Sequence, residues 1–370
     1  MSAASAAREV ERAISATPRT VGLEVRGPVL GTLEDVARAK APAGVEARIA
    51  ELRALCEGDL AGIEADLDAI ESGPTPMQQS ARHLLMLGGK RLRPMCVALA
   101  ARAGSGFTPA ARDLAVAAEL VHNATLLHDD VVDLGDRRRG APASRVIYGN
   151  AASIFAGDWL LVEALMRVRR AGMLDVLDRA LGVIAEMLAA EGLQLARRGR
   201  VDTTVDDYMA VVRGKTASLF RWALHAGARA GGLDEADCAK LETYGDKLGV
   251  AFQIVDDALD VDGEADVLGK ELFADLREGK MTYPLLVALD RRPELRSELA
   301  SRLSVEDATI DDVTARRAVA AMRETGAIVE TRRLADSLVR EAVASLDGLP
   351  DRPATRALAA VAEVVVARRK

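Results

Sequence analysis

The sequence contains few aromatic residues, few cysteines and few lysines. Only 3% of its 370 residues are aromatic, whereas Ala, Leu, Val, Arg and Glu dominate. Because pleated sheets favour aromatic and β-branched side chains, this composition favours helices. The three cysteines, Cys56, Cys96 and Cys238, are widely spaced and form no CxxC pair. This spacing argues against a zinc site and indicates a reducing compartment.

Long apolar runs and a positive net charge are also absent. No run reaches the ~20 residues of a membrane span, and residues 1–15 lack the apolar core of a signal peptide. A net charge of −7 argues against general nucleic-acid binding. The 49% of hydrophobic residues supply ample material for a core. We therefore expect a cytoplasmic helical protein without a nucleic-acid partner or an integral membrane segment.

Apolar residues recur at helical spacing over most of the chain. The predicted helices cover residues 45–70, 77–86, 94–103, 108–133, 147–171, 174–198, 204–230, 233–260, 280–290, 313–324, 327–346 and 351–369. Several are apolar nearly all round, which indicates burial at the centre of a bundle. Residues 1–45, broken by Gly and Pro, are expected to be an N-terminal extension of unknown role. Residues 46–370 are expected to form one all-α domain, a bundle of ten or more helices around a central cavity.

Two acidic clusters of the form DDxxD occur at the ends of apolar helices, in HDDVVD (128–133) and QIVDDALD (253–260). Carboxylates four residues apart share one helix face. Burying neighbouring carboxylates requires a cation, and oxygen ligands without His or Cys favour Mg²⁺. A single such cluster is typical of a solvated helix end, but two within apolar helices predict two or three Mg²⁺ ions around one diphosphate. The predicted metal ligands are Asp129, Asp130, Asp133, Asp256 and Asp260. The second aspartate of each cluster, Asp130 or Asp257, lies ~100° from the shared face and can either lean in or bond a neighbour.

Basic residues flank the first acidic cluster. GGKRLRP (88–94) places three cations after a glycine pair, and RRRG (137–140) follows the aspartates. Glycine lets backbone N–H groups approach an anion, Arg offers a bidentate fork and Lys a point charge. A basic run alone is typical of a solvated surface, but beside the acidic cluster these runs predict phosphate binding.

Taken together, these motifs resemble those of the polyprenyl synthetase family, the trans-type isoprenyl diphosphate synthases. Further matching stretches are GNAASIFAGDWLL (149–161), GKTASLF (214–220) and LGKELFADLREGKMTYPLL (268–286). The resemblance covers roughly residues 46–370 and implies the isoprenoid synthase fold. It also implies Mg²⁺-dependent prenyl transfer, in which an allylic diphosphate ionises and the double bond of isopentenyl diphosphate attacks. A homodimer is a further expectation from the family.

The resemblance assigns roles to individual residues. Those implied to be catalytic are Asp129, Asp133, Lys215, Thr216, Gln253 and Asp256. Those implied to hold the diphosphate of isopentenyl diphosphate are Lys90, Arg93, His122 and Arg139. Those implied to hold the allylic substrate are Arg138, Lys215, Thr216, Gln253, Lys270 and Lys280. Four of the eight lysines in the chain therefore fall within the predicted site.

Small residues before the first aspartate cluster bear on product length. Val121, Ala124 and Thr125 are expected to line the tunnel for the growing chain, and none of them is aromatic. In the family, an aromatic residue there closes the tunnel early. We therefore predict a long-chain product of about six to ten isoprene units, suited to a quinone side chain. Release of so insoluble a product is expected to involve transient contact with a membrane surface.

Four other interpretations are weighed against this one. A tunnel floor formed by residues 155–166 would give a short-chain farnesyl or geranylgeranyl diphosphate synthase. A class I terpene cyclase needs the acidic clusters but not the isopentenyl diphosphate residues, which are all present. A regulatory subunit usually loses one acidic cluster, and this chain keeps both. An iron-binding carboxylate bundle needs an ExxH pair, which we do not find at useful spacing.

Overall fold

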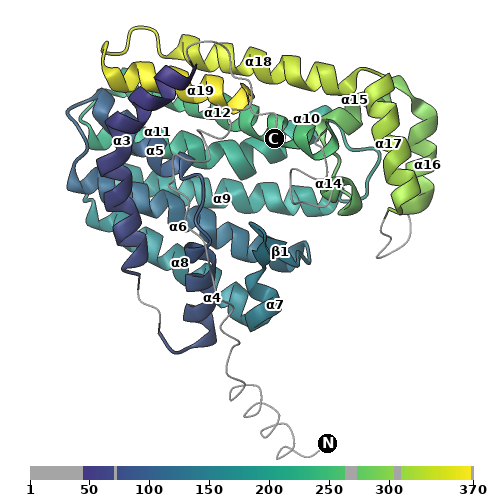
Figure 1. Ribbon diagram of the computed structural model, residues 1–370, viewed down its shortest axis with the longest axis horizontal. Helices are drawn as coiled ribbons and strands as arrows, with labels where there is room; N and C mark the ends of the chain where they lie inside the picture. The colour runs from purple at the N-terminus through teal and green to yellow at the C-terminus, as the bar shows by residue number, and fades with distance from the viewer. Residues whose placement is uncertain (1–44, 71–72, 263–272, 304–309, 368–370) are drawn as a thin grey trace, which may run out of the picture.

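The computed structural model describes residues 45–70, 73–262, 273–303 and 310–367. Most of these residues lie in helices (Figure 1). The helices are Val45–Asp68 (α3), Pro76–Met86 (α4), Leu92–Ala103 (α5), Pro109–Val132 (α6), Ser144–Tyr148 (α7), Asn150–Arg170 (α8), Leu174–Arg197 (α9), Val205–Val212 (α10), Ser218–Ala230 (α11), Glu235–Asp262 (α12), Ala274–Arg277 (α14), Tyr283–Arg291 (α15), Pro293–Leu303 (α16), Asp312–Glu324 (α17), Ala327–Ser345 (α18) and Pro353–Ala367 (α19). A π-helical segment (η1, Arg213–Ala217) joins α10 to α11, and the strands β1 (Arg137–Arg138) and β2 (Ala141–Pro142) form one antiparallel pair.

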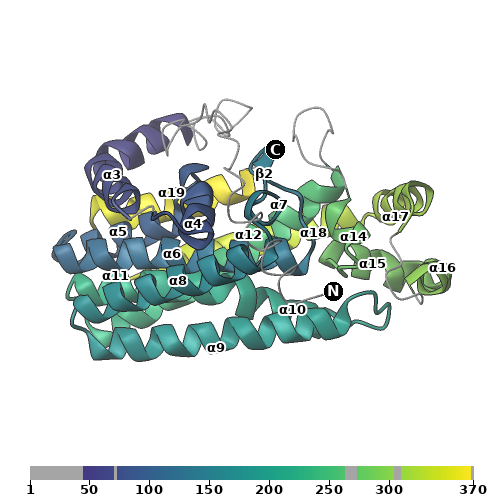
Figure 2. The same cartoon turned by 90° about the horizontal axis from the view of Figure 1, so that it is seen from below.

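The bundle is built around α11, which packs against α5, α6, α9 and α12. Its side chains are buried almost without interruption, as the apolar pattern predicts for a central helix. One continuous core runs from Leu52 of α3 to Val365 of α19. Helices α3 and α19 pack on each other (Figure 1), while α9 forms one long edge of the molecule with α8 beside it (Figure 2). The predicted all-α bundle is confirmed.

Close helix contacts at glycine bring α12 against η1 and α11. A Cβ atom at Gly249 would lie 2.5 Å from the Cα of Ala217, and one at Gly245 would lie 2.8 Å from the Cα of Arg221. Only a residue without a side chain allows this approach. About two turns beyond Gly249, α12 carries the aspartates of the second cluster, so this contact sets the distance of that cluster from η1.

The predicted helix 204–230 is divided by the π-helical segment η1. Lys215 and Thr216 lie within it. A Cβ atom at Gly214 would lie 2.7 Å from the Cβ of Ala190, so η1 also packs tightly on α9. Short π-helical insertions are uncommon and occur frequently at functional sites.

The elements that were not predicted include the short helix α14, helix α16 and the β1–β2 hairpin. Helix α16 has too few apolar positions at regular spacing to be recognised, because charged residues interrupt its sequence PELRSELASRL. The β1–β2 hairpin turns at Arg139 and Gly140, which both have positive φ (52° and 80°), as in a type I′ turn. Within the described part of the chain, no helix combines the length and apolarity that a membrane span requires.

Candidate active site

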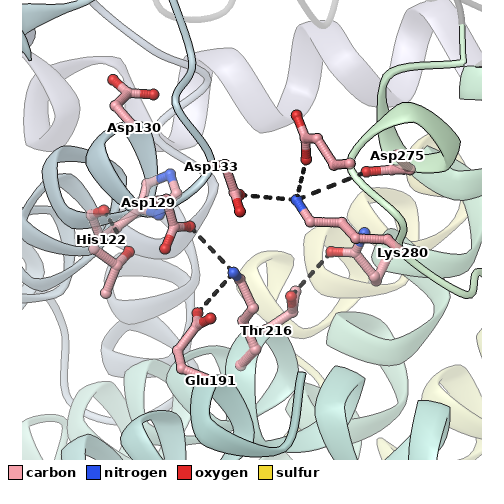
Figure 3. A network of polar contacts seen from close by, with 12 residues as sticks. His122, Asp129, Asp130, Asp133, Glu191, Thr216, Asp275 and Lys280 are labelled. Carbon is pink, nitrogen blue, oxygen red and sulfur yellow. Dashed lines mark hydrogen bonds and ion pairs between the residues drawn. The ribbon is translucent and has the colours of Figure 1, made fainter. Parts of the chain in front are cut away.

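Asp129 and Asp133 project from the C-terminal end of α6 towards two lysines on other elements (Figure 3). A carboxylate oxygen of Asp129 lies 3.2 Å from the Nζ of Lys215 in η1. A carboxylate oxygen of Asp133 lies 2.9 Å from the Nζ of Lys280, which precedes α15. The four-residue spacing therefore places both carboxylates on one side of α6, facing two of the predicted substrate-binding lysines.

Each of these lysines is surrounded by further carboxylates. Lys215 lies 2.7 Å from Glu191 of α9, and Lys280 lies 2.6 Å from Glu278. Burial alone lowers the pKa of Lys280, but Asp275, Asp133 and Glu278 outweigh it and raise the pKa above its ordinary range. At Lys215, burial also lowers the pKa, but the carboxylates of Asp129 and Glu191 outweigh it. The pKa of Lys215 is therefore raised as well. Both ammonium groups are therefore charged at neutral pH.

A cavity opens beside these ion pairs. It is lined by residues of α9, α10, η1, α12 and the segment before α15, including the predicted residues Lys215, Thr216, Gln253 and Lys280. Further lining residues that sequence reasoning did not select are Arg197, Arg198, Asp207, Tyr208, Asp257 and Asp275. Four predicted residues from three separate stretches of the sequence thus meet at one cavity.

A chain of hydrogen bonds crosses this cavity from η1 to α12. The hydroxyl of Thr216 donates to the Oε1 of Gln253 (3.0 Å), and the Nε2 of Gln253 donates to Asp257 (2.8 Å). The hydroxyl of Tyr208 in α10 donates to the other oxygen of Asp257 (2.6 Å). Burial, together with the charge of Asp275, raises the pKa of Asp257 to about 8. Asp257 therefore fixes the orientation of Gln253, which in turn orients Thr216.

Asp256 and Asp260, the predicted metal ligands of α12, are both half-buried. Lys270 lies outside the described residues. Among the residues that the structure describes, no three acidic, His or Cys side chains are already gathered as a metal site. The donors nevertheless fit a hard divalent cation, because they offer only oxygen.

Asp130 points away from Asp129 and Asp133 (Figure 3). Its buried carboxylate accepts hydrogen bonds from Arg138 of the β1–β2 hairpin, with 2.9 Å to the Nε. Burial raises the pKa of Asp130 despite this partner. Asp130 and Arg138 thus hold the hairpin against α6.

The four residues predicted for isopentenyl diphosphate lie around GGKRLRP. A Cβ atom at Gly89 would lie 3.0 Å from the Nη2 of Arg139, so the guanidinium rests against the glycine. Lys90 lies 6.0 Å from the ring centroid of Phe252, and Arg93 lies 4.6 Å from that of Phe220. These distances fit cation–π contacts.

Burial and mutual repulsion both lower the pKa values of cations in this group. Burial, with a smaller contribution from Arg139, lowers the pKa of Arg93 to about 10. Burial and the charge of Arg93 hold the pKa of His122 well below its ordinary value. Buried cations that repel one another favour an anionic ligand.

A buried ion-pair cluster holds the GGKRLRP segment (88–94) in place. Arg91, which has a positive φ of 48°, lies 2.5 Å from Glu64 of α3 and 2.5 Å from Glu119 of α6. Burial raises the pKa of Glu119, but Arg91, His122 and Arg139 outweigh it, and the pKa falls to about 2. Arg91 therefore fixes the backbone between Lys90 and Arg93. Sequence reasoning grouped Arg91 with the phosphate-binding cations.

Val121, Ala124 and Thr125, predicted to line a product tunnel, lie on α6 before Asp129. Val121 and Ala124 are buried in the core, and Thr125 is half-buried with its hydroxyl donated to the carbonyl of His122 (2.8 Å). None of the three lines the cavity at η1. Their role in product length stays a prediction.

Several residues of the site were not singled out from the sequence. Asp275 and Glu278 lie in the quoted stretch LGKELFADLREGKMTYPLL (268–286), so the motif itself contained the signal. Glu191 and Arg198 lie at the end of α9, in EGLQLARRGR (191–200), a stretch rich in charge without a recognised motif.

The chain is similar in sequence and in structure to known proteins. A model of the polyprenyl synthetase family matches residues 74–322. The chain is 36% identical over 322 residues to the octaprenyl diphosphate synthase of Escherichia coli (strain K12), covering 86% of this chain and 98% of that one. It is 35% identical over 300 residues to a short chain isoprenyl diphosphate synthase of Methanothermobacter thermautotrophicus, covering 80% and 91%. Its structure is similar (TM-score 0.82, 34% identity, 90% and 100% coverage) to a polyprenyl synthase of Caulobacter crescentus CB15 complexed with calcium and isoprenyl diphosphate.

Proposed function

The chain belongs to the polyprenyl synthetase family, and on this basis we propose that it elongates an allylic diphosphate with isopentenyl diphosphate by sequential head-to-tail trans condensation. The observation that carries the proposal is the pairing of Asp129 and Asp133 (Figure 3) with Lys215 and Lys280, two lysines that line one cavity together with Gln253 and Asp257 of α12. Carboxylates and ammonium groups interleaved in this way suit a diphosphate that binds together with divalent cations.

The allylic diphosphate is assigned to the cavity lined by α9, α10, η1 and α12, beside the ion pairs of Asp129 and Asp133. The residues proposed to hold it are Arg138, Lys215, Thr216, Gln253, Lys270 and Lys280. Negative charge develops on the diphosphate as its bond to the allylic carbon breaks, and fixed cations at that position lower the barrier. The raised pKa values of Lys215 and Lys280 support this role, because both groups stay charged throughout.

Thr216 and Gln253 are assigned to the allylic cation that remains. Their side-chain oxygens are dipoles that stabilise positive charge without capturing the carbon covalently. The hydrogen bonds from Gln253 and Tyr208 to Asp257 support this role, because they keep the oxygen of Gln253 turned towards Thr216.

Isopentenyl diphosphate is assigned to Lys90, Arg93, His122 and Arg139. A neutral His122 still offers one N–H donor to a phosphate oxygen, and the arginines offer bidentate forks. The double bond attacks the allylic cation, and the proton lost at the end passes to the departing diphosphate. No dedicated base is needed in this scheme.

Mg²⁺ is the proposed metal, as two or three ions held by Asp129, Asp133, Asp256 and Asp260. When bound, Mg²⁺ neutralises charge on the diphosphate. The similar polyprenyl synthase of Caulobacter crescentus is complexed with calcium and isoprenyl diphosphate. Calcium is a hard cation like Mg²⁺, and this complex therefore supports the proposed metal. Asp130 contributes by anchoring the hairpin that carries Arg138.

The proposed product is long, with six to ten isoprene units, and suits a quinone side chain. The absence of an aromatic side chain at Val121, Ala124 and Thr125 supports an open tunnel. The similarity to an octaprenyl diphosphate synthase (36% identity) supports a long product, and the similarity to a short chain synthase (35% identity) supports the short-chain alternative.

A homodimer through α8 and α9 is proposed as the working form. Leu174, Leu181, Leu188 and Leu195 recur every seven residues along α9 and are 49% to 70% exposed. The neighbouring helix α8 exposes Phe155, Val162 and Met166. An exposed stripe of this extent is typical of a helix that packs against a partner, and the occupant proposed is a second copy of this chain.

Residues 46–370 are proposed as the catalytic domain, with residues 1–45 as an extension. The continuous core from α3 to α19 supports a single unit. The cytoplasm is the proposed compartment, since all three cysteines are unpaired and buried. Transient contact with a membrane surface is proposed for release of the product.

Product analysis tests the proposed function directly. The purified full-length protein is incubated with Mg²⁺, farnesyl diphosphate and isopentenyl diphosphate. The products are then dephosphorylated, and their molecular masses are measured by mass spectrometry. Products of six to ten units are expected, and chelation of Mg²⁺ is expected to abolish them. Products of three or four units would identify a short-chain enzyme, and turnover of farnesyl diphosphate alone would identify a cyclase.

Paired variants test the residue assignment. Asp129→Asn is expected to lower kcat by about 10²–10³-fold, because it removes a charge at the leaving group. Asp136→Asn serves as the matched control, since its carboxylate is 80% exposed and pairs with Arg145 at the surface. Equal activity of the two variants would overturn the assignment of the first cluster.

A further inference from the structure

Arg198 lies where the C-terminal end of α9 reaches the allylic cavity. It follows the last residue of the helix, lines the cavity and is 33% exposed. Its Nη2 atom lies 3.5 Å from the Oδ1 of Asp133, while the Nζ of Lys280 lies 2.9 Å from the Oδ2 of the same carboxylate. Two cations from different elements thus converge on one aspartate of the first cluster.

The side chain of Arg198 is also tied to the turn that presents Lys280. Its Nε donates to the carbonyl oxygen of Glu278 (2.7 Å). The backbone N–H of Gly199 donates to the carbonyl of Gly279 (2.8 Å), and Gly279 adopts a positive φ of 73°. A Cβ atom at Gly279 would lie 3.2 Å from the backbone N of Gly199. The end of α9 and the Lys280 turn are therefore joined by two hydrogen bonds and a close backbone contact.

These contacts leave one edge of the guanidinium directed at the site. The Nε is committed to Glu278, and the Nη2 side faces Asp133 and the cavity. The neighbouring Arg197 differs, because it pairs with Asp207 at 3.2 Å. The Nε contact fixes the guanidinium of Arg198, and its Nη groups face the cavity. A guanidinium held in this way is suited to bind two oxygens of a diphosphate.

We propose that Arg198 binds the diphosphate of the allylic substrate directly and positions Lys280 beside it. The inference rests on the proposed function, since it places the allylic diphosphate in this cavity. Arg198 shares the cavity with Lys215, Thr216, Gln253 and Lys280, whereas the residues assigned to isopentenyl diphosphate do not line it. The ligand is therefore the allylic diphosphate, and Arg198 adds a third cation to the two lysines.

Steady-state kinetics of Arg198→Met test the inference. We expect KM for farnesyl diphosphate to rise about ten-fold or more, because a charge-assisted contact is lost, with KM for isopentenyl diphosphate within about two-fold of the wild type. Arg198→Lys retains the charge without the fork and is expected to fall between the two. Arg200→Met is the control, since Arg200 is an exposed residue of the same loop that pairs with Asp202. An unchanged KM for farnesyl diphosphate in Arg198→Met overturns the proposal.

Calorimetric binding of inorganic pyrophosphate, with Mg²⁺ and with EDTA, separates binding from a purely structural role. Arg198→Met is expected to weaken pyrophosphate binding about ten-fold in both buffers. A lower melting temperature with unchanged pyrophosphate affinity would show that Arg198 only supports the fold. Failure of the proposed function itself would be distinct, because the wild-type protein would then form no condensation product from the two substrates.

Discussion

The buried Arg91 cluster makes a sharp prediction about stability. In Arg91→Met the apolar part of the side chain is retained, but Glu119 stays buried without its main partner. The guanidinium of Arg91 and the carboxylate of Glu119 are 1% and 3% exposed, so water cannot replace the lost contact. Removing one partner of a buried pair typically costs about 3–5 kcal/mol.

The pKa of Glu119 gives an independent magnitude. It falls from the ordinary 4.5 to about 2, in large part because of Arg91. At about 1.4 kcal/mol per factor of ten, this corresponds to about 3 kcal/mol of folding free energy at neutral pH. The two estimates agree, and we expect Arg91→Met to lose about 3 kcal/mol.

The loss is also expected to depend on pH. A carboxyl whose pKa is lowered on folding stabilises the protein above its unfolded pKa, and this contribution disappears as the pH falls through the folded pKa. For Glu119 the window runs from about pH 4.5 down to about pH 2. The difference in unfolding free energy between the wild type and Arg91→Met should therefore be largest near pH 7. At pH 4 this difference should be smaller by about 1 kcal/mol.

Urea denaturation at both pH values measures these quantities. Arg102→Met is the control, because Arg102 forms a similar pair with Asp59 but is 33% exposed, and it should lose at most about 1 kcal/mol. The double variant Arg91→Met/Glu119→Gln should recover part of the loss, since no buried charge remains unpaired. A loss in Arg91→Met no larger than in the control, or one that is independent of pH, would refute the reasoning.

Three further predictions follow from other parts of the structure. Ala124→Phe should shorten the product if this residue lines the tunnel; an unchanged product mass distribution would assign the length to another wall. Gly249→Ala should destabilise the fold by about 1–3 kcal/mol and reduce kcat, because its methyl group would collide with Ala217. The control Gly58→Ala, with open space around it, should be neutral or slightly stabilising in the same denaturation assay. Leu188→Glu should convert a dimer to a monomer in sedimentation velocity; Val313→Glu, an equally exposed residue on α17, should not.

Local sequence pattern predicted much of this protein, because helix periodicity and motif spacing act over a few residues. The shared face of Asp129 and Asp133 followed from a spacing of four. The partners of these carboxylates were harder to predict. Glu191 and Arg198 reach the site from α9, and only the packing of α9 on η1 brings them there. The tight contact of Gly214 with that helix cannot be read from either segment alone.

The position of a residue within a motif was also insufficient to predict its contacts. The spacing left open whether Asp130 and Asp257 lean into the site or bond a neighbour, and each is buried and accepts a hydrogen bond from a neighbouring side chain. Arg91, inside a basic run, is neutralised by two glutamates. In each case the outcome depends on which element packs opposite, and a single sequence does not contain that information.

The π-helical segment η1 has a consequence for insertions and deletions. A π turn accommodates one residue more than an α turn. Deleting one residue between 213 and 217 would permit an unbroken α-helix and would keep α10 and α11 in phase, because the wide turn takes up the extra residue. Lys215 and Thr216 lie within that turn, so they would move, and Lys215 would lose its alignment with Asp129. Shortening this stretch by a single amino acid would make the helix more regular and disassemble the site.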